Sequence, residues 1–164
     1  MGASAPNEVW CLDFCFDYCL NGTKLKVLAV FDEHTRECLA LEAATSFKSL
    51  RVLGSLFESP GAPQNFRSDN GSEFVSRSLA VFLSRSGTQS RFIKSGSPWQ
   101  NGLAESFVSR LRAELLDVEV FHNLADAQVK LALFRRFYNE QLPHSSLGYM
   151  TPAQAVLSCR KDYS

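Results

Sequence analysis

A single stretch of ten residues, EVWCLDFCFD at positions 8–17, constrains the fold more than any other part of the sequence. Its aromatic and aliphatic residues occupy both sets of alternating positions, so a strand built from it is apolar on both faces. Strands of this kind lie in the middle of a sheet that has helices packed on each side. The stretch also contains Asp13, and burial of its carboxylate costs free energy unless the group is hydrogen-bonded, paired or bound to a metal ion. We therefore expect a central strand that carries one constrained carboxylate.

The rest of the pattern predicts a mixed α/β domain. Apolar segments at 24–32 and 37–43, the first of them after an Asn-Gly turn at 21–22, predict two further strands and an antiparallel meander. The chain then continues with a helix after Thr45 or Ser46, a strand at 64–69, a helix that ends at Gly87, a strand at 90–93, a glycine-containing loop at 94–102, a helix that follows it, and a long helix capped by Asn123. The order β-β-β-α-β-α-β-α-α implies a mixed sheet with helices on both faces.

Length and composition fit one globular domain. The chain has 164 residues, 45% of them hydrophobic and 21% charged, and its longest unbroken apolar run is the five residues 27–31, far short of a membrane span. Net charge is zero, with a small excess of acids before residue 85 and of bases after it. We expect a leader or vector-derived segment at 1–7, the core at 8–158 and a tail at 159–164.

Cysteine and histidine usage does not predict a zinc site. The five cysteines form no Cys-x-x-Cys pair and the three histidines are scattered. We expect buried or free thiols in a reducing cytoplasm.

Asp69 lies in RSDNGSEF, directly after the predicted fourth strand. Ligands of open α/β sheets gather at such strand ends, although an Asn-Gly turn capped by the Asp is the simpler interpretation. Glu105 falls in the first turns of the next helix, where an acid also suits the helix dipole. Ser109 and Arg112 follow it at i+4 and i+7 and predict one polar stripe, either a solvated face or a face that meets phosphate.

Three carboxylates, two from strands and one from a helix, can converge at one edge of such a sheet. Carboxylate oxygens are the ligands that Mg²⁺ and Mn²⁺ prefer. Two such ions can stabilise the attacking and leaving oxygens of an in-line phosphoryl displacement.

Six motifs in this order resemble the catalytic core of integrases and transposases of the D,D-35-E type, in the ribonuclease-H-like superfamily. They are VWCLDF, LAVFDEHTREC, RSDNGSEF, SPWQNGLAESF, RLRAELL and FYNEQLPHSSLGYMTPAQAV. Thirty-five residues lie between Asp69 and Glu105, the spacing that names the group. The resemblance covers nearly the whole chain and is closest to bacterial insertion-sequence transposases whose core is similar to retroviral integrase. It implies a ribonuclease-H-like fold with a five-stranded mixed sheet: a three-strand antiparallel meander plus two parallel strands.

The resemblance also implies roles for individual residues. Asp13, Asp69 and Glu105 correspond to the catalytic metal ligands, which hold Mg²⁺ or Mn²⁺, two ions in all. Asn70 and Gly71 correspond to residues that shape the site. The implied DNA contacts are Lys94, Gln100, Asn101, Ser109 and Arg112.

The implied activity is cutting a DNA strand with water and then joining its 3′-hydroxyl to target DNA. The implied partners are the ends of a mobile element, target DNA and further copies of the chain, as a dimer or higher oligomer, in the bacterial cytoplasm near the nucleoid. No membrane and no small-molecule substrate is expected. Two alternatives are a non-catalytic DNA- or partner-binding descendant of a transposase and a structure-selective nuclease of the same fold.

Two departures bear on these expectations. Leu142 stands where the family usually has Arg in the segment after Tyr-Asn. In addition, no helix-turn-helix or zinc-binding segment precedes Trp10 in this sequence, so we expect the module that recognises element ends to be absent from it.

Overall fold

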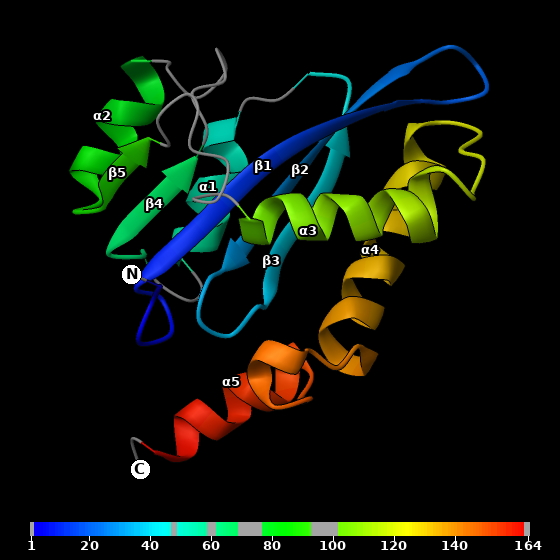
Figure 1. Cartoon of the computed structure of the whole chain (residues 1–164). Helices are drawn as coiled ribbons and strands as arrows, with labels where there is room; N and C mark the ends of the chain where they lie inside the picture. Colours follow the sequence, from blue (N-terminus) through cyan, green and yellow to red (C-terminus); the bar gives the residue numbers. More distant parts are fainter. Residues whose placement is uncertain (1, 47–48, 59–61, 69–76, 93–101, 163–164) are drawn as a thin grey trace.

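The computed structural model of the chain describes residues 2–46, 49–58, 62–68, 77–92 and 102–162 and contains one five-stranded sheet (Figure 1). The strand order across the sheet is β3-β2-β1-β4-β5. The strands are β1 (Val9–Tyr18), β2 (Lys24–Asp32), β3 (Cys38–Ala44), β4 (Asn65–Ser68) and β5 (Gln89–Phe92). The helices are α1 (Ser49–Glu58), α2 (Arg77–Arg85), α3 (Gly102–Leu111), α4 (Leu124–Gln141) and α5 (Pro152–Lys161), with a π-helical turn η2 (Arg112–Leu116) and a 3-10 turn η3 (Ser145–Leu147).

Strand β1 is central and pairs in both senses. It runs antiparallel to β2, with Asp13 opposite Ala29, and parallel to β4, with Cys11 opposite Arg67. β2 pairs antiparallel with β3, and β4 pairs parallel with β5. The predicted mixed sheet, a three-strand meander plus two parallel strands, is therefore confirmed.

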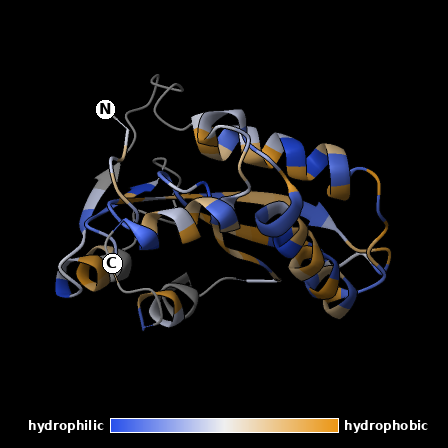
Figure 2. Ribbon diagram, turned by 90° about the horizontal axis from the view of Figure 1, so that it is seen from below, coloured by the Kyte–Doolittle hydropathy of each residue, from blue (hydrophilic) through white to orange (hydrophobic). Residues whose placement is uncertain are grey.

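Helices cover both faces of the sheet, and each face has its own apolar core. The strands form a largely hydrophobic layer between the helices in Figure 2. On one face α3 and α4 pack on the meander, and the Phe107 ring lies 4.3 Å from that of Phe31. On the other face Phe57 of α1 and Phe82 of α2 pack near Trp10, which is fully buried. This two-sided burial explains why the first predicted strand carries apolar residues at both alternations.

Most predicted elements are confirmed to within two residues, but α5 and the two short helical turns η2 and η3 were not predicted. The Asn123 side chain accepts a hydrogen bond from the Asp126 N–H and begins α4, as predicted. Helix α5 was not predicted, although Thr151 and Gln154 form a capping box around Pro152 at its start. The π-helical turn that follows α3 was also not predicted.

The segment before β1 is attached to the domain through Asp32. This carboxylate is 2% exposed and accepts hydrogen bonds from the N–H groups of Asn7 at 2.6 Å, His34 at 2.9 Å and Thr35 at 2.9 Å. Asn7 in turn accepts a hydrogen bond from the Trp10 indole at 3.1 Å. Part of the segment predicted as a leader thus contacts the core directly.

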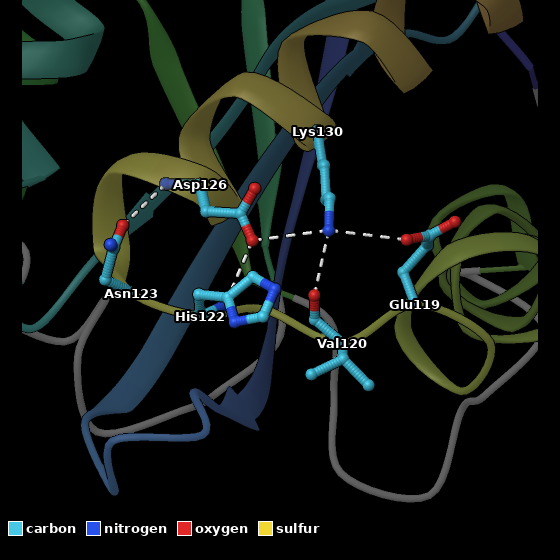
Figure 3. Close-up of polar contacts among 6 residues, drawn as sticks. All are labelled: Glu119, Val120, His122, Asn123, Asp126 and Lys130. Carbon is cyan, nitrogen blue, oxygen red and sulfur yellow. Dashed lines mark hydrogen bonds and ion pairs between the residues drawn. The ribbon is translucent and has the colours of Figure 1, made fainter.

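A cluster of charges holds the segment between η2 and α4 (Figure 3). The Lys130 ammonium lies 3.2 Å from Asp126, 3.3 Å from Glu119 and 2.8 Å from the Val120 carbonyl oxygen. The Asp126 carboxylate also accepts the His122 N–H, and this bond is the main cause that lowers the pKa of Asp126. The same segment meets the β1–β2 turn, where the Leu20 N–H donates to the Phe121 carbonyl oxygen at 2.8 Å.

In the part of the chain that the structure describes, we find no helix with the length and hydropathy needed to cross a membrane.

We predict that Asp32→Ala destabilises the fold strongly, because it leaves three N–H donors without their charged acceptor. A loss of about 3 kcal/mol in the free energy of unfolding is expected, which lowers Tm by roughly 6–12 °C in a chain of this size. Chemical denaturation and thermal melts measure both quantities. The control is Asp117→Ala, since Asp117 is exposed and forms only a 3.9 Å surface pair with Arg112. Equal stability of the two variants would contradict this role for Asp32.

Candidate functional site

Asp13 lies on the face of β1 that α3 and α4 cover. It alternates in phase with Cys15, which belongs to the core on that face, whereas Leu12 and Phe14 belong to the opposite core. The side chain is partly buried, and its Oδ1 accepts the N–H of Phe14 at 2.8 Å. Burial is the main cause that raises the pKa of the Cys15 thiol, and the nearby charges of Arg112, Asp13 and Asp17 also affect this pKa. The effect of Asp13 agrees with its placement on the same face as Cys15.

Glu105 lies in the first turn of α3 and is exposed. The helix is held by the buried side chains on its other side, Ala104, Phe107 and Leu111. Helix α3 packs across β1 on the face that carries Asp13 (Figure 1). The fold thus brings two of the three predicted carboxylates to one side of the sheet, one from the central strand and one from the helix start.

Asp69 lies outside the described residues, directly after Ser68, the last residue of β4. The other predicted positions outside them are Asn70, Gly71, Lys94, Gln100 and Asn101. In the described part of the sheet, Val9 pairs with Asn65 and Cys11 with Arg67, a constant offset of 56 positions between β1 and β4. Asp13 and Asp69 are separated by the same 56 positions in the sequence.

Ser109 and Arg112 have different surroundings. Ser109 is exposed on α3, one turn after Glu105. Arg112 begins the π-helical turn, and its guanidinium donates to the Phe16 carbonyl oxygen at 3.1 Å and lies 3.9 Å from Asp117. Arg112 therefore links the end of α3 to the C-terminal end of strand β1, a contact that the polar stripe in the sequence did not predict.

The departure at Leu142 has a local structural role. Its side chain is partly buried and packs on the core that α3 and α4 share. It also forms the C-cap position of α4. An apolar residue is compatible with this position.

In the described part of the chain, no group of three or more His, Cys, Asp or Glu side chains is arranged to hold a metal ion. All five thiols are free, and four of them are buried: Cys11, Cys15, Cys19 and Cys38. Burial raises the pKa of the Cys11, Cys15 and Cys38 thiols to about 12. The expectation of free, buried thiols is confirmed.

Comparison with known proteins agrees with the fold. A family model described as "Integrase core domain" matches residues 3–98, and a second model with the same description matches residues 86–152. A simian T-cell lymphotropic virus intasome, solved in complex with a PP2A regulatory subunit, contains a chain similar in fold, with a TM-score of 0.73 and 15% identity over 94% of this chain and 56% of that one. The HTLV-2 integrase catalytic core domain, solved with magnesium as a dimer, gives a TM-score of 0.61 and 15% identity over 93% of this chain and 97% of that one.

Bacterial insertion elements supply more similar sequences. The IS407 uncharacterized 31.7 kDa protein of Burkholderia multivorans is 38% identical over 92% of this chain and 55% of its own length. The IS476 uncharacterized 39.2 kDa protein of Xanthomonas euvesicatoria is 36% identical over 98% of this chain and 47% of its own length. The putative transposase InsD of IS2E from Escherichia coli is 32% identical over 90% of this chain and 72% of its own length. The chain spans about half the length of the first two relatives.

The sheet order, the helices on both faces and the likeness to integrase cores define a ribonuclease-H-like fold. Within that class the chain belongs to the integrase core domain family, in the branch of the insertion-sequence transposases.

We predict that only one thiol reacts rapidly with a disulfide reagent at pH 8, because Cys159 alone is not buried. The measurement is the time course of thiol release, which should reach five thiols per chain only in denaturant. Cys159→Ser should remove the fast phase and Cys19→Ser should leave it. Two or more fast thiols in the native chain would contradict the burial described above.

Proposed function

We propose that this chain is the catalytic core of a DNA-cutting and DNA-joining enzyme, a polynucleotidyl transferase that acts on the ends of a mobile element. The observation that carries the proposal is that β1 lies beside β4 in the sheet and packs against α3. In the sequence, β1, the position after β4 and the first turn of α3 each hold one carboxylate of the D,D-35-E pattern. Ligands of α/β sheets gather at such strand ends.

The β1–β4 register supports a place for Asp69 in this site. Continuation of the parallel pairing by two residues beyond Cys11–Arg67 would bring position 69 opposite position 13. Because alternate residues of neighbouring parallel strands share a face, both carboxylates would then point to the side covered by α3. Glu105 begins the helix on that side.

The donor set fits a hard divalent cation. Carboxylate oxygens are the ligands that Mg²⁺ and Mn²⁺ prefer, and Asp13 is a carboxylate held partly buried on a mostly apolar strand. We propose that Asp13, Asp69 and Glu105 hold two ions, which would supply charge stabilisation to both oxygens of an in-line displacement.

The residues of the chain would position this chemistry rather than form covalent intermediates. The fixed strand places Asp13, and the helix packed by Phe107 and Leu111 places Glu105. Ser109, exposed one turn further along, would lie beside the DNA backbone. Arg112 would contribute its positive charge from the end of α3, where its hydrogen bond to Phe16 fixes it.

Further parts of the proposal concern the residues outside the described ranges and the assembly. Asn70 and Gly71 would shape the site, and Lys94, Gln100 and Asn101 would contact DNA. We propose residues 8–158 as the catalytic core, working as a dimer or higher oligomer in the bacterial cytoplasm near the nucleoid, with the element ends recognised by a module outside these residues.

Strand joining tests this proposal directly. A pre-cut DNA end is incubated with the protein and Mn²⁺, and joined product is measured on denaturing gels. We predict that Asp13→Asn, Asp69→Asn and Glu105→Gln each lower joining by more than about 100-fold, because even outer partners of metal ligands cost 10–100-fold. The matched control is Asp17→Asn, four residues further along the same face of β1, which should retain joining.

Thermal melts of each variant separate loss of activity from loss of fold. Undiminished joining by the Asp69→Asn variant would overturn the assignment. Cutting without joining by the wild type would favour a nuclease, and DNA binding without either reaction would favour a non-catalytic descendant.

A further inference from the structure

The end of β1 carries a row of aromatic side chains on the face opposite Asp13. Phe14, Phe16 and Tyr18 alternate along the strand and point to the side of α1 and α2. The apolar core of that face includes Phe14 at its margin. Beyond it, Phe16 is 42% exposed and Tyr18 is 62% exposed. In Figure 1 the β1–β2 hairpin extends past α1 and α2, so this row continues onto open sheet surface.

Two lysines on β2 lie directly beside these rings. Lys26 pairs with Phe16 and Lys24 with Tyr18 in the antiparallel register, on the same face of the sheet. The Lys26 ammonium is 4.3 Å from the centroid of the Phe14 ring, and that of Lys24 is 5.0 Å from the centroid of the Phe16 ring. We call these five residues, Phe14, Phe16, Tyr18, Lys24 and Lys26, the hairpin aromatic face.

The lysine positions show the direction in which the ring faces are turned. A cation over a ring centroid lies against the ring face and not its edge. The faces of Phe14 and Phe16 are therefore directed toward the side on which the flexible lysine side chains lie. A planar group can stack on the exposed Phe16 ring when the Lys24 ammonium turns from it to a neighbouring phosphate.

We propose that the hairpin aromatic face binds an unpaired DNA strand. Bases stack on exposed aromatic rings of a sheet without regard to sequence, and nearby lysines neutralise the phosphates. Alternate residues of a strand are about 6.6–6.8 Å apart, so successive rings offer separate positions along one strand. A duplex has already stacked its bases, and only the two lysines would be available to it.

The charges near the hairpin aromatic face favour a nucleic acid over a second copy of the chain or a lipid bilayer as the partner that binds there. The neighbouring strand β3 adds one acid on this face, Glu42, opposite Leu28 of β2. Among the described residues, this face therefore carries two positive charges and one negative charge, interleaved with rings. A second copy of the chain would bring like charges together, and a bilayer would meet two charged lysines beside the exposed side chains of Phe16, Tyr18 and, in the β1–β2 turn, Leu20.

This site is separate from the carboxylates of the proposed function. Asp13 points to the α3 side of the same strand, and the hairpin aromatic face lies on the other side. The inference needs no metal ion and no catalysis, so it stands or falls independently of strand joining.

Fluorescence anisotropy with a labelled single-stranded oligonucleotide tests the site, in EDTA to exclude the metal-dependent reaction. We predict that Phe16→Leu combined with Tyr18→Leu weakens binding about tenfold, within the range that base stacking contributes. Lys24→Gln should make the dependence of log K on log salt shallower by about 0.7, the value for one phosphate contact on a single strand. Duplex of the same sequence should bind more weakly than the single strand and should not respond to the aromatic changes.

Matched variants on other surfaces serve as controls. Phe137→Leu replaces a ring that is 40% exposed on α4, and Tyr149→Leu replaces one that is 75% exposed near η3. Neither should change the affinity. Equal affinity of the Phe16/Tyr18 double variant and the wild type would overturn the inference. The inference would also be overturned if the double variant lost only self-association, measured by sedimentation, or only binding to lipid vesicles.

Discussion

The parallel pairing of β1 with β4 is the contact on which the rest of this structure depends. It joins the antiparallel meander of β3, β2 and β1 to the parallel strands β4 and β5. It also brings the segment that ends at Ser68 beside the strand that carries Asp13. Burial of Trp10, Leu12 and Phe66 around this pairing contributes about 1.5–3 kcal/mol for each side chain. That gain outweighs the cost of one carboxylate held partly buried by a backbone hydrogen bond.

Strand β1 therefore carries side chains of interest on both faces of the sheet. Toward one side it presents Asp13, on the face covered by the helix that carries Glu105. Toward the other side it presents aromatic side chains, of which those after Phe14 lie outside the core. Two hydrogen bonds hold the end of this strand in place. The Phe16 carbonyl oxygen accepts one from the Arg112 guanidinium, and the Leu20 N–H donates one to the Phe121 carbonyl oxygen in the segment before α4. The Lys130 cluster holds that segment in turn (Figure 3). The position of α3 on the sheet is thus tied to the hairpin and to α4.

The sequence predicts the sheet well because its signals are local and strong. Apolar residues at both alternations of β1 identify a central strand, and Asn123 identifies the start of α4. Helix α5 was missed because its apolar periodicity is weak and only the Thr151–Gln154 capping box indicates it. The π-helical turn and the Arg112–Phe16 contact were missed because they depend on tertiary packing between residues 96 positions apart. For the site, the sequence placed Asp13 on a strand and Glu105 on a helix, as the structure has them, and the roles of Asp13, Asp69 and Glu105 stay predictions.

The most direct test of the account is Mn²⁺ binding measured by electron paramagnetic resonance on the protein alone. The wild type should bind Mn²⁺, and Asp13→Asn, Asp69→Asn and Glu105→Gln should each weaken that binding by more than about tenfold, because each removes a charged oxygen ligand. Asp17→Asn, on the same face of β1, should bind as the wild type does. Equal Mn²⁺ affinity in all five proteins would show that these three carboxylates do not form one metal site and would contradict the account.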